Sequence, residues 1–513
     1  MLRILLILLT TSLFMSCSRN PVTGKREFTL MSESQEISMG QSSDPSIVAQ
    51  FGLYDDPVIQ SFIQEKGKEM AAISHRPDLP YTFKVLDSPV INAFALPGGP
   101  VYFTRGILAH FNNEAQFAGV LGHEIGHVTA KHSAKRYSNG MLAQVGLMAG
   151  MIFSETFRTM GDAAGQAMGL LLLKHGRDAE SESDMLGVTY SSKIGYDSHE
   201  MAGFFQTLNR LQEASGQAIP NFLSTHPNPA DRYDKVHEMS DNLQEIANYD
   251  YYKINRNEYL HMIDGIVYGE DPRQGFTENY VFYHPALKFF FPYPSNWNLI
   301  NSPQAVMIGP KDGKAMIQFT LGEGSSLDQV AQTEVQNGKL TVVESQRTNV
   351  NGFDAISMIS DQVTPAQQGQ QGQTIRILSY FIKQGQYIYK FHGMSLKADF
   401  NRYYNSFEST FKGFSPLTDP SKINVMPEKI DIISVPTTTT LRQALIAGKI
   451  ESSRLEEFSI LNGMLLTDQV EAGTLIKVIE ANGVVSATPS TTPTQKVAPE
   501  KKATKRAAKR AGN

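Results

Sequence analysis

The chain has 513 residues, of which 41% are hydrophobic and 19% charged, and its formal net charge is −5. This length and apolar content predict two to four domains with cores of their own and exclude a wholly disordered protein. The tail from 481 to 513 holds seven Lys or Arg residues against one Glu, so its charge of +6 leaves −11 for the rest. Such an acidic body argues against nucleic acid as the main partner.

The amino terminus has the layout of a secretory signal. A basic residue precedes the apolar run 4–9, which is too short to span a bilayer. Cys17, the single cysteine, stands where a bacterial lipoprotein signal is cut and acylated, although Phe14 replaces the usual Leu of that motif. Ser18 does not mark retention at the inner membrane as Asp would. We therefore expect a signal peptide at 1–17, an outer-membrane lipoprotein facing the periplasm, and no intrachain disulfide.

His123, Glu124 and His127 form the HExxH pattern of zinc-dependent peptidases. Residues four apart lie on nearly the same helix face, so the two histidines can bind one metal ion beside the carboxylate. A helix is expected because Asn112 or Asn113 can cap it and because apolar residues follow at helical spacing. The pattern alone also occurs in helices that bind no metal, so a further ligand has to decide between the two readings.

Two other histidines and one apolar segment near this helix are interpreted conservatively. His132 lies five residues after His127, about 140° around the helix, and is predicted to be a helix-end histidine rather than a ligand. His175 precedes a glycine and is predicted to lie in a loop. Residues 140–174 predict either a helical hairpin that gates the active site or contacts lipid, or a buried helix pair.

An acidic segment about fifty residues downstream supplies a candidate third ligand. Catalytic zinc usually has three protein ligands and a position open for water, and Glu180 on a second helix would complete such a set. Asp184 lies one turn further on the same face, where it can accept the outer N–H of a zinc-bound histidine. Glu182 is expected to lie on a solvated face, as most acidic runs do.

Together these segments resemble the gluzincin metallopeptidase family that includes HtpX, the CAAX-prenyl endopeptidase and periplasmic BepA. The matching residues are HExxH at 123–127 and the pattern Glu180-x-x-x-Asp184-x-x-Gly187, and the resemblance covers about residues 20 to 270. It implies a mainly helical, zincin-type peptidase domain with a small sheet, placed at 18–270. It also implies one Zn2+ per chain, bound by the two HExxH histidines and Glu180.

Two further segments fit the same family. Residues 92–103 predict a strand, a Gly-Pro turn and a second strand; in relatives this resembles the edge that pairs with an extended substrate, and a plain hairpin is the alternative. The resemblance also places His226 near the zinc, either as an oxyanion donor or in the open coordination position. In the implied mechanism Glu124 is the general base on a zinc-bound water, and His226 or Arg177 stabilises the oxyanion.

From residue 280 the pattern changes to short aromatic and β-branched runs. These runs and two helical segments predict an antiparallel α+β domain at 280–415. Its opening at 290–297 resembles PsbP or Mog1-like domains, and the absence of a catalytic constellation favours a scaffold or a protein-contact role. There is no helical repeat of the kind found in BepA-type relatives, so their partners are not transferred. The expected strands are 280–283, 288–291, 315–319, 375–382 and 387–391.

The remaining third unit is small. Residues 416–430 contain three prolines and predict a linker. Residues 431–480 resemble a LysM-like β-α-α-β module, which suggests contact with peptidoglycan. The tail at 481–513 is rich in Thr, Pro and Lys, which predicts disorder and possible contact with anionic surfaces.

Two functions follow from these features. The favoured one is a zinc-dependent endopeptidase of the bacterial cell envelope that hydrolyses misfolded or stalled exported proteins. The alternative is an envelope assembly or chaperone-like binding factor with a latent zinc site, held shut by His226 or by residues 140–174. Both readings imply protein or peptide partners and membrane attachment through a lipid anchor at Cys17, and neither implies nucleic acid.

Overall fold

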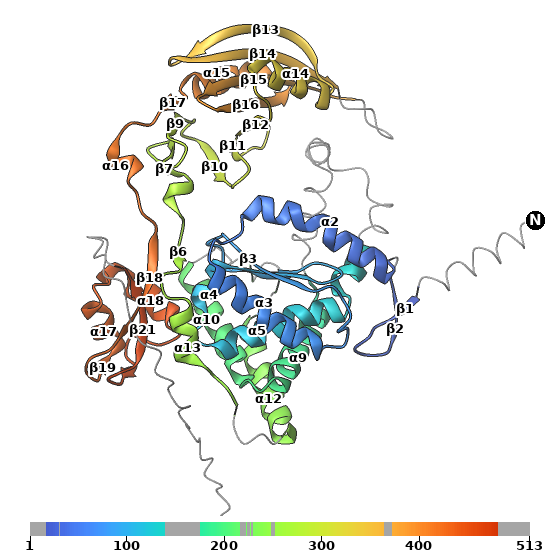
Figure 1. The fold of residues 1–513 in the computed structure, drawn as a ribbon, viewed down its shortest axis with the longest axis vertical. Helices are drawn as coiled ribbons and strands as arrows, with labels where there is room; N and C mark the ends of the chain where they lie inside the picture. Colours follow the sequence, from blue (N-terminus) through green and yellow to red (C-terminus); the bar gives the residue numbers. More distant parts are fainter. Residues whose placement is uncertain are drawn as a thin grey trace, which may run out of the picture.

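The computed structural model describes most of the chain in three parts (Figure 1). A helical body is formed by residues up to 268, a β-rich outer domain by 272–417, and a C-terminal module by 428–480. The expectation of a multidomain protein with a helical domain followed by a β-rich one is confirmed. The described residues are 17–29, 31–138, 175–215, 222, 226, 229–247, 252–363 and 372–480. The predicted signal core, the segment 140–174 and the basic tail lie outside them.

The body is built mainly from helices around one buried helix. Every residue of α5 (Glu114–Thr129) is buried, and Asn113 caps the helix with its Oδ1 accepting from the Gln116 N–H at 2.8 Å. Gln116 in turn accepts from the backbone N–H of Asn112 at 2.8 Å, so both asparagines proposed as caps help to start the helix. The other helices of the body are α2 (Glu33–Phe51), α3 (Pro57–Ala72), α4 (Arg105–His110), α9 (Arg177–Lys193), α10 (His199–Ser215), α12 (Pro229–Ala247) and α13 (Arg256–Met262).

Helices α5 and α9 approach each other closely because glycines line their contact. A Cβ atom added at Gly122 would lie 3.0 Å from the Cα atom of Gly187, and one added at Gly126 would lie 3.0 Å from the Cβ atom of Leu186. Larger side chains at these positions would push the helices apart. Gly122, Gly126 and Gly187 therefore set the distance between the two helices, and with it the distance at which side chains of α9 reach those of α5.

A small three-stranded sheet covers the body beside α5. Its order is β3 (Thr82–Leu86), β5 (Pro100–Thr104) and β4 (Ala93–Ala95), with β3 parallel and β4 antiparallel to β5. The predicted strand, turn and strand at 92–103 is thus present, and β4 forms an edge of this sheet. Gly98 and Gly99 have positive φ angles of 81° and 126° in the connecting turn. A two-stranded hairpin, β1 (Cys17–Arg19) with β2 (Arg26–Phe28), precedes α2.

The outer domain contains an antiparallel seven-stranded sheet of order β10-β11-β12-β16-β15-β14-β13 and a four-stranded sheet of order β17-β9-β8-β7. The two helices α14 and α15 cover opposite faces of the larger sheet: neighbouring residues of β15, Tyr380 and Phe381, belong to the α15 and α14 cores respectively. Bounds are β7 (Phe276–Glu278), β8 (Val281–His284), β9 (Phe289–Pro292), β10 (Trp297–Asn301), β11 (Val306–Pro310), β12 (Ala315–Leu321), α14 (Leu327–Asn337), β13 (Thr341–Val350), β14 (Phe353–Val363), β15 (Thr374–Gln384), β16 (Tyr387–Leu396), α15 (Phe400–Lys412) and β17 (Ser415–Pro416).

All five strands expected in this region are present, and six others of the outer domain were missed. The missed strands are β7, β10, β11, β13, β14 and β17. Strand β13 is exposed along nearly its whole length, so its residues lack the alternation of apolar and polar types that would have identified it.

The chain leaves the body through β6 (Val267–Tyr268) and returns through β18 (Glu428–Ser434), and these two strands pair with each other (Figure 1). The C-terminal module then continues with α17 (Leu441–Ala447), α18 (Leu455–Leu461) and β21 (Leu475–Ile479), and β21 pairs with β18. This is the β-α-α-β order expected from the sequence, joined by one short pair, β19 (Thr439–Thr440) with β20 (Gln469–Val470). Strand β18 begins inside the segment expected to be a linker. Short elements complete the chain: η1 (Pro272–Gln274), α16 (Pro420–Ile423) and η2 (Ser452–Arg454).

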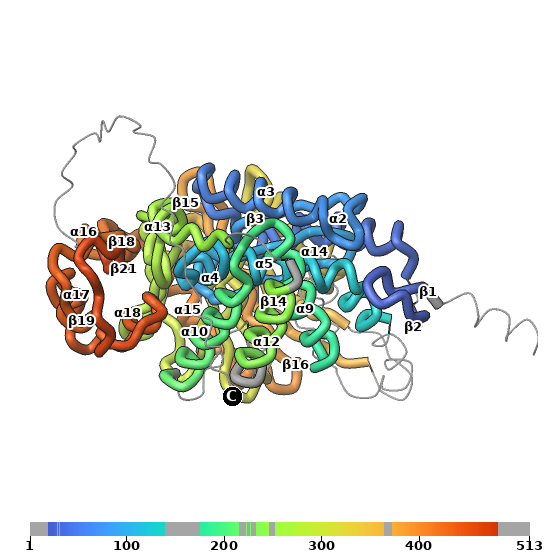
Figure 2. Tube along the Cα trace, turned by 90° about the horizontal axis from the view of Figure 1, so that it is seen from below, coloured from blue at the N-terminus to red at the C-terminus, as the bar shows by residue number. Residues whose placement is uncertain are grey.

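The C-terminal module is fused to the body through a shared core. Seen from below, it lies beside α13, at the opposite end of the body from β1 and β2 (Figure 2). Apolar residues of α17, α18 and β21 belong to the same buried cluster as those of α5 and α10. The amine of Lys477 is fully buried there and donates to the carbonyl oxygens of Ala109, Phe111 and Leu461 at 2.8, 2.7 and 3.1 Å. Burial lowers the pKa of Lys477, but three acceptors require the three N–H donors of the ammonium form.

Candidate metal centre

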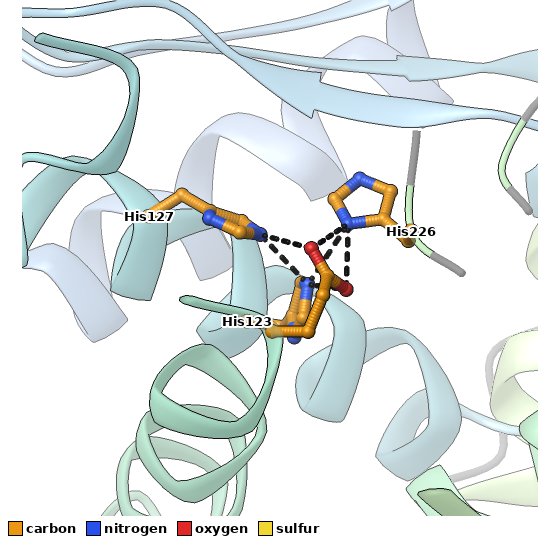
Figure 3. Close-up of side chains that lie close together, drawn as sticks. His123, His127 and His226 are labelled. Atoms are coloured by element: carbon orange, nitrogen blue, oxygen red, sulfur yellow. Dashed lines mark hydrogen bonds and ion pairs between the residues drawn. The ribbon is translucent and has the colours of Figure 1, made fainter. Parts of the chain in front are cut away.

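His123 and His127 meet on one face of α5, one helical turn apart. Their Nε2 atoms are 3.0 Å from each other, and both side chains are almost fully buried. Figure 3 shows both rings directed toward a common point that His226 also faces. The four-residue spacing of the two histidines, close to one helical turn, thus produces the arrangement that the sequence predicts.

Glu180 and His226 come to the same point from other parts of the chain. Glu180, in the first turn of α9, has Oε1 3.5 Å from Nε2 of His127 and Oε2 3.7 Å from Nε2 of His123. His226 has Nδ1 3.0 Å from Oε1 of Glu180 and 3.2 Å from Nε2 of His123. The four side chains are buried and together form a group that could hold one metal ion.

The spacing of these donor atoms fits zinc. Zinc binds nitrogen and carboxylate oxygen at about 2.0–2.2 Å, so neighbouring ligand atoms of a tetrahedral site lie about 3.3–3.6 Å apart. The separations between the four side chains run from 3.0 to 3.7 Å, close to that value. Two or three imidazoles with one carboxylate are also the ligands that zinc prefers. The residues present therefore fit a zinc ion.

Asp184 and Arg232 support two members of this group. Asp184 has Oδ1 2.9 Å from Nδ1 of His123, on the side of the ring away from the metal group. Arg232, on α12, donates to both oxygens of Asp184 at 2.8 and 2.5 Å, and its Nη1 lies 3.2 Å from Oε2 of Glu180. All of these side chains are buried. Each charged group therefore depends on its partner of opposite charge, rather than on water, for compensation.

Arg232 was not among the residues expected to act in the site, whereas Arg177 was. Arg177 is the first residue of α9 and is exposed, so the structure does not bring it into the group. Its role as an oxyanion donor stays a prediction. Nothing in the sequence distinguishes Arg232 from a surface arginine except its position six residues after His226, at the start of the next helix.

His132 and Glu182 form a chain of contacts behind His127. Nδ1 of His132 lies 3.0 Å from Nδ1 of His127, and Nε2 of His132 lies 3.1 Å from Oε2 of Glu182. His132 is outside the metal group, as expected, but it contacts a member of it rather than solvent. The side chain of Glu182 is only 18% exposed, which corrects the expectation of a solvated residue. His175 lies in a loop, as expected, and its ring stacks on His127 at 4.0 Å.

The carboxylate of Glu124 is buried beside the group without joining it. Its Oε1 lies 3.6 Å from Nε2 of His226 and accepts no hydrogen bond from the residues that the structure describes. Burial raises the pKa of Glu124, only partly offset by His226 and His123. Burial would also raise the pKa of Glu180, but His226 and Arg232 outweigh it and hold that pKa well below the usual range. The surroundings thus shift the two pKa values in opposite directions. Glu124 binds a proton more readily than an ordinary carboxylate, and Glu180 stays charged.

Comparison with known proteins identifies the central part of the chain. Residues 58–240 match the model of peptidase family M48. A mitochondrial metalloendopeptidase OMA1 of Arabidopsis thaliana is 32% identical over 174 residues, which cover 34% of this chain and 34% of that protein. A beta-barrel assembly-enhancing protease of Yersinia pestis is 29% identical over 222 residues, covering 41% of this chain and 45% of that protein. The chain therefore spans less than half the length of these relatives.

Among solved structures, a cyanobacterial PsbP of Synechocystis is similar over 26% of this chain and 91% of its own. The sequence identity is 10% and the TM-score 0.23. At this score the PsbP or Mog1-like character of the outer domain stays a prediction.

Proposed function

Because residues 58–240 match the model of peptidase family M48, we propose that this chain is a zinc-dependent endopeptidase with Glu124 as its general base. The observation that carries the proposal is the convergence of His123, His127 and Glu180 from two helices at zinc-ligand spacing. Glu124 lies next to these ligands but outside them, where a base is needed. Both OMA1 and the beta-barrel assembly-enhancing protease are named as proteases, which supports the same reaction class.

The cofactor is a zinc ion, which when bound supplies a Lewis acid that activates water and polarises the scissile carbonyl. His123, His127 and Glu180 would hold it. Glu124, whose pKa is raised by burial, takes a proton and later returns it to the leaving amine. Arg232 keeps Asp184 and Glu180 charged and in place.

Hydrogen bonds behind the ligands fix which ring nitrogen faces the metal. Asp184 accepts from Nδ1–H of His123, which leaves the lone pair of Nε2 on that ring free to hold a zinc ion were one bound. His127 achieves the same through a longer chain: its Nδ1–H donates to Nδ1 of His132, and Nε2–H of His132 donates to Glu182. Both ligand histidines therefore have a carboxylate behind them, one in direct contact and one through a second ring.

The substrate is an extended segment of polypeptide that pairs with β4, an edge strand among the strands that the structure describes. This strand forms an edge of its sheet and contacts α5, which carries the ligands. An extended peptide added to such an edge forms main-chain hydrogen bonds whatever its sequence, which suits an enzyme that degrades misfolded or stalled exported proteins.

Metal analysis combined with casein cleavage tests this function. We expect about one zinc per chain at the HExxH site, cleavage of casein, loss of cleavage with a chelator and recovery when zinc is returned. A protein that binds no zinc, or that cleaves equally well with and without the chelator, would refute the proposal.

A second candidate function is favoured by the position of His226. Its Nδ1 lies near three ligand atoms, in the place of a fourth tetrahedral ligand, and catalytic zinc sites keep that place open. In this reading the site is latent and the chain acts as an envelope assembly or chaperone-like binding factor. Equal rescue of an envelope defect by the wild type and by Glu124→Gln would favour it.

The role of His226 itself can be separated in the same assay. If His226 closes the site, His226→Ala opens the fourth position and peptide cleavage rises. If it donates to the oxyanion, the same change lowers kcat by about 10²–10³-fold. Measured zinc content should stay near that of the wild type in both cases, because three ligands remain.

The cell envelope is the proposed location, supported by the signal-like amino terminus and the lipoprotein cysteine Cys17. Within the described residues, no helix has the length and apolar character needed to cross a bilayer. We propose attachment through acylation of Cys17, so Cys17→Ser should release the protein from membranes. Continued membrane association of that variant would count against the anchor.

The C-terminal module is proposed to contact peptidoglycan, on the strength of its β-α-α-β order. Co-sedimentation of the full chain with murein tests this, and a chain that stays in solution would remove the proposal.

A further inference from the structure

A second cluster of metal-ligand side chains lies between α10 and α12, apart from the metal centre. His199, the first residue of α10, has Nε2 3.2 Å from Oδ1 of Asp241 on α12. His237, one turn before Asp241 on the same helix, has Nδ1 3.6 Å from Oδ2 of that carboxylate. The candidate ligand atoms of these three residues all lie within 4.8 Å of one another.

The spacing of this cluster matches the metal centre described above. Tetrahedral zinc ligands lie about 3.3–3.6 Å apart. In this cluster the two histidine nitrogens lie at similar separations from the Asp241 carboxylate, 3.2 Å from Oδ1 and 3.6 Å from Oδ2. Two imidazoles and one carboxylate form a common zinc-binding set. The side chains are 24%, 46% and 45% exposed for His199, His237 and Asp241, so a hydrated ion can reach them and keep a water ligand.

A carboxylate behind His199 holds its ring in the orientation that such a site needs. Oδ1 of Asp197 lies 2.7 Å from Nδ1 of His199, which directs Nε2 toward Asp241. Asp197 is itself held, because Gln244 of α12 donates to the same oxygen at 3.0 Å. An outer carboxylate that is fixed in turn by a hydrogen bond is the usual support of a metal-bound histidine.

We propose that His199, His237 and Asp241 bind a divalent cation of the zinc class, independently of the metal centre. The ion joins the start of α10 to the middle of α12. Arg232 precedes His237 by five residues on α12 and pairs with Asp184 and Glu180. Loading of this second site therefore stabilises the helix that supplies the arginine of the first. The cluster does not depend on the proposed peptidase activity, since none of its members belongs to the catalytic group.

Zinc stoichiometry of the purified full chain tests the proposal. We expect His237→Ala to bind one zinc ion fewer than the wild type, and His261→Ala, which removes an exposed histidine of α13, to bind the same number as the wild type. The test depends on the difference in zinc content between the variants and the wild type, not on how much zinc the HExxH site holds. A negative result would therefore leave the peptidase proposal unaffected. Equal zinc content in wild type and His237→Ala would overturn it.

A second variant covers the case in which His237→Ala fails to fold. Asp241→Asn keeps the shape of the side chain and is expected to lose the same zinc ion while keeping the far-ultraviolet circular dichroism of the wild type. Titration of the wild type with zinc should raise Tm in two steps, and Asp241→Asn should lack one of them. A two-step rise that persists in Asp241→Asn would also overturn the proposal.

Discussion

The helical body and the outer domain fill their interiors with different chemistry. Around α5 and α9 the body buries histidines, carboxylates and an arginine, each held by a partner of opposite charge or by a hydrogen bond. The outer domain is filled by aromatic rings: the ring of Phe319 lies 5.1 Å from that of Phe289 and 4.5 Å from that of Phe391, centroid to centroid. Its buried polar residues are fewer and mostly neutral.

The contrast indicates that the helical body carries the chemistry and that the outer domain is a scaffold. Burying a charged group costs free energy unless partners compensate for lost water, so a dense network of buried ionisable groups is retained only where it has a use. An aromatic core stabilises a sheet without such a network. Substitutions in the body should therefore alter metal binding and cleavage, whereas those in the outer domain should alter stability alone.

The largest effect is expected from Glu124→Gln. Loss of the general base should lower kcat by about 10²–10⁴-fold while zinc content stays unchanged, because Glu124 is not a ligand. In the wild type, cleavage should fall as pH drops through the raised pKa of Glu124, since the protonated carboxyl cannot accept a proton. Glu65→Gln, on the exposed face of α3, is the matched control. Cleavage by Glu124→Gln at the rate of the parent would contradict the assignment.

The next largest effect is expected from Lys477→Met, which tests whether the C-terminal module is part of the body. Removal of the ammonium leaves the carbonyls of Ala109, Phe111 and Leu461 buried without their shared donor. The free energy of unfolding should fall by about 3 kcal/mol or more, measured by urea denaturation. Lys449→Met, at an exposed lysine of the same module, should change it little. A separate unfolding transition of the module would show that the two are not one unit.

A smaller effect is expected from His132→Phe. This change removes the acceptor for Nδ1–H of His127 while keeping a ring of similar size. Zinc affinity should fall about 10-fold to 100-fold, measured by competition with a chromogenic chelator. Glu182→Gln should also lower the zinc affinity, but by less, because the amide oxygen still accepts a hydrogen bond from His132. Unchanged affinity in His132→Phe would mean that this ring does not orient the ligand.

The smallest effect is expected in the outer domain, from Asp361→Asn. Arg376 and Lys397 lower the pKa of Asp361 to about 2, below its ordinary value, so its charged form stabilises the fold above about pH 4. That stability is lost as pH falls toward 2. Because Lys397 is half-exposed and Arg376 partly exposed, solvent screens both ion pairs, and the loss at pH 7 should be under about 1 kcal/mol, with no change in zinc content. An altered zinc content would show that the two regions are coupled.

Much of the metal group could be predicted because it depends on local periodicity. The four-residue spacing of His123 and His127, and of Glu180 and Asp184, places each pair on one face of its own helix. The capping asparagine also follows from a short pattern. These features need only helical geometry and a close approach of two helices.

The contacts that were missed all join residues across different elements. His132 and Glu182 carry no local sign that they meet, and their pairing exists only because α9 packs against the end of α5. Arg232 and Arg177 look alike in sequence, and the packing of α12 on α9 decides which one reaches Glu180. Strand β13 is recognised by its pairing with β14, since its own residues lack a buried face.

By itself the sequence determined which side chains could bind a metal and on which helices they lie, because periods of 3.6 and 2.0 residues are properties of the local backbone. The packing of separate elements decided that His226 contacts both His123 and Glu180 and that Arg232 pairs with Asp184. It also decided that Lys477 ties the C-terminal module into the body. Those outcomes depend on how separate elements pack, and packing is set by the fit of whole surfaces that no short pattern encodes.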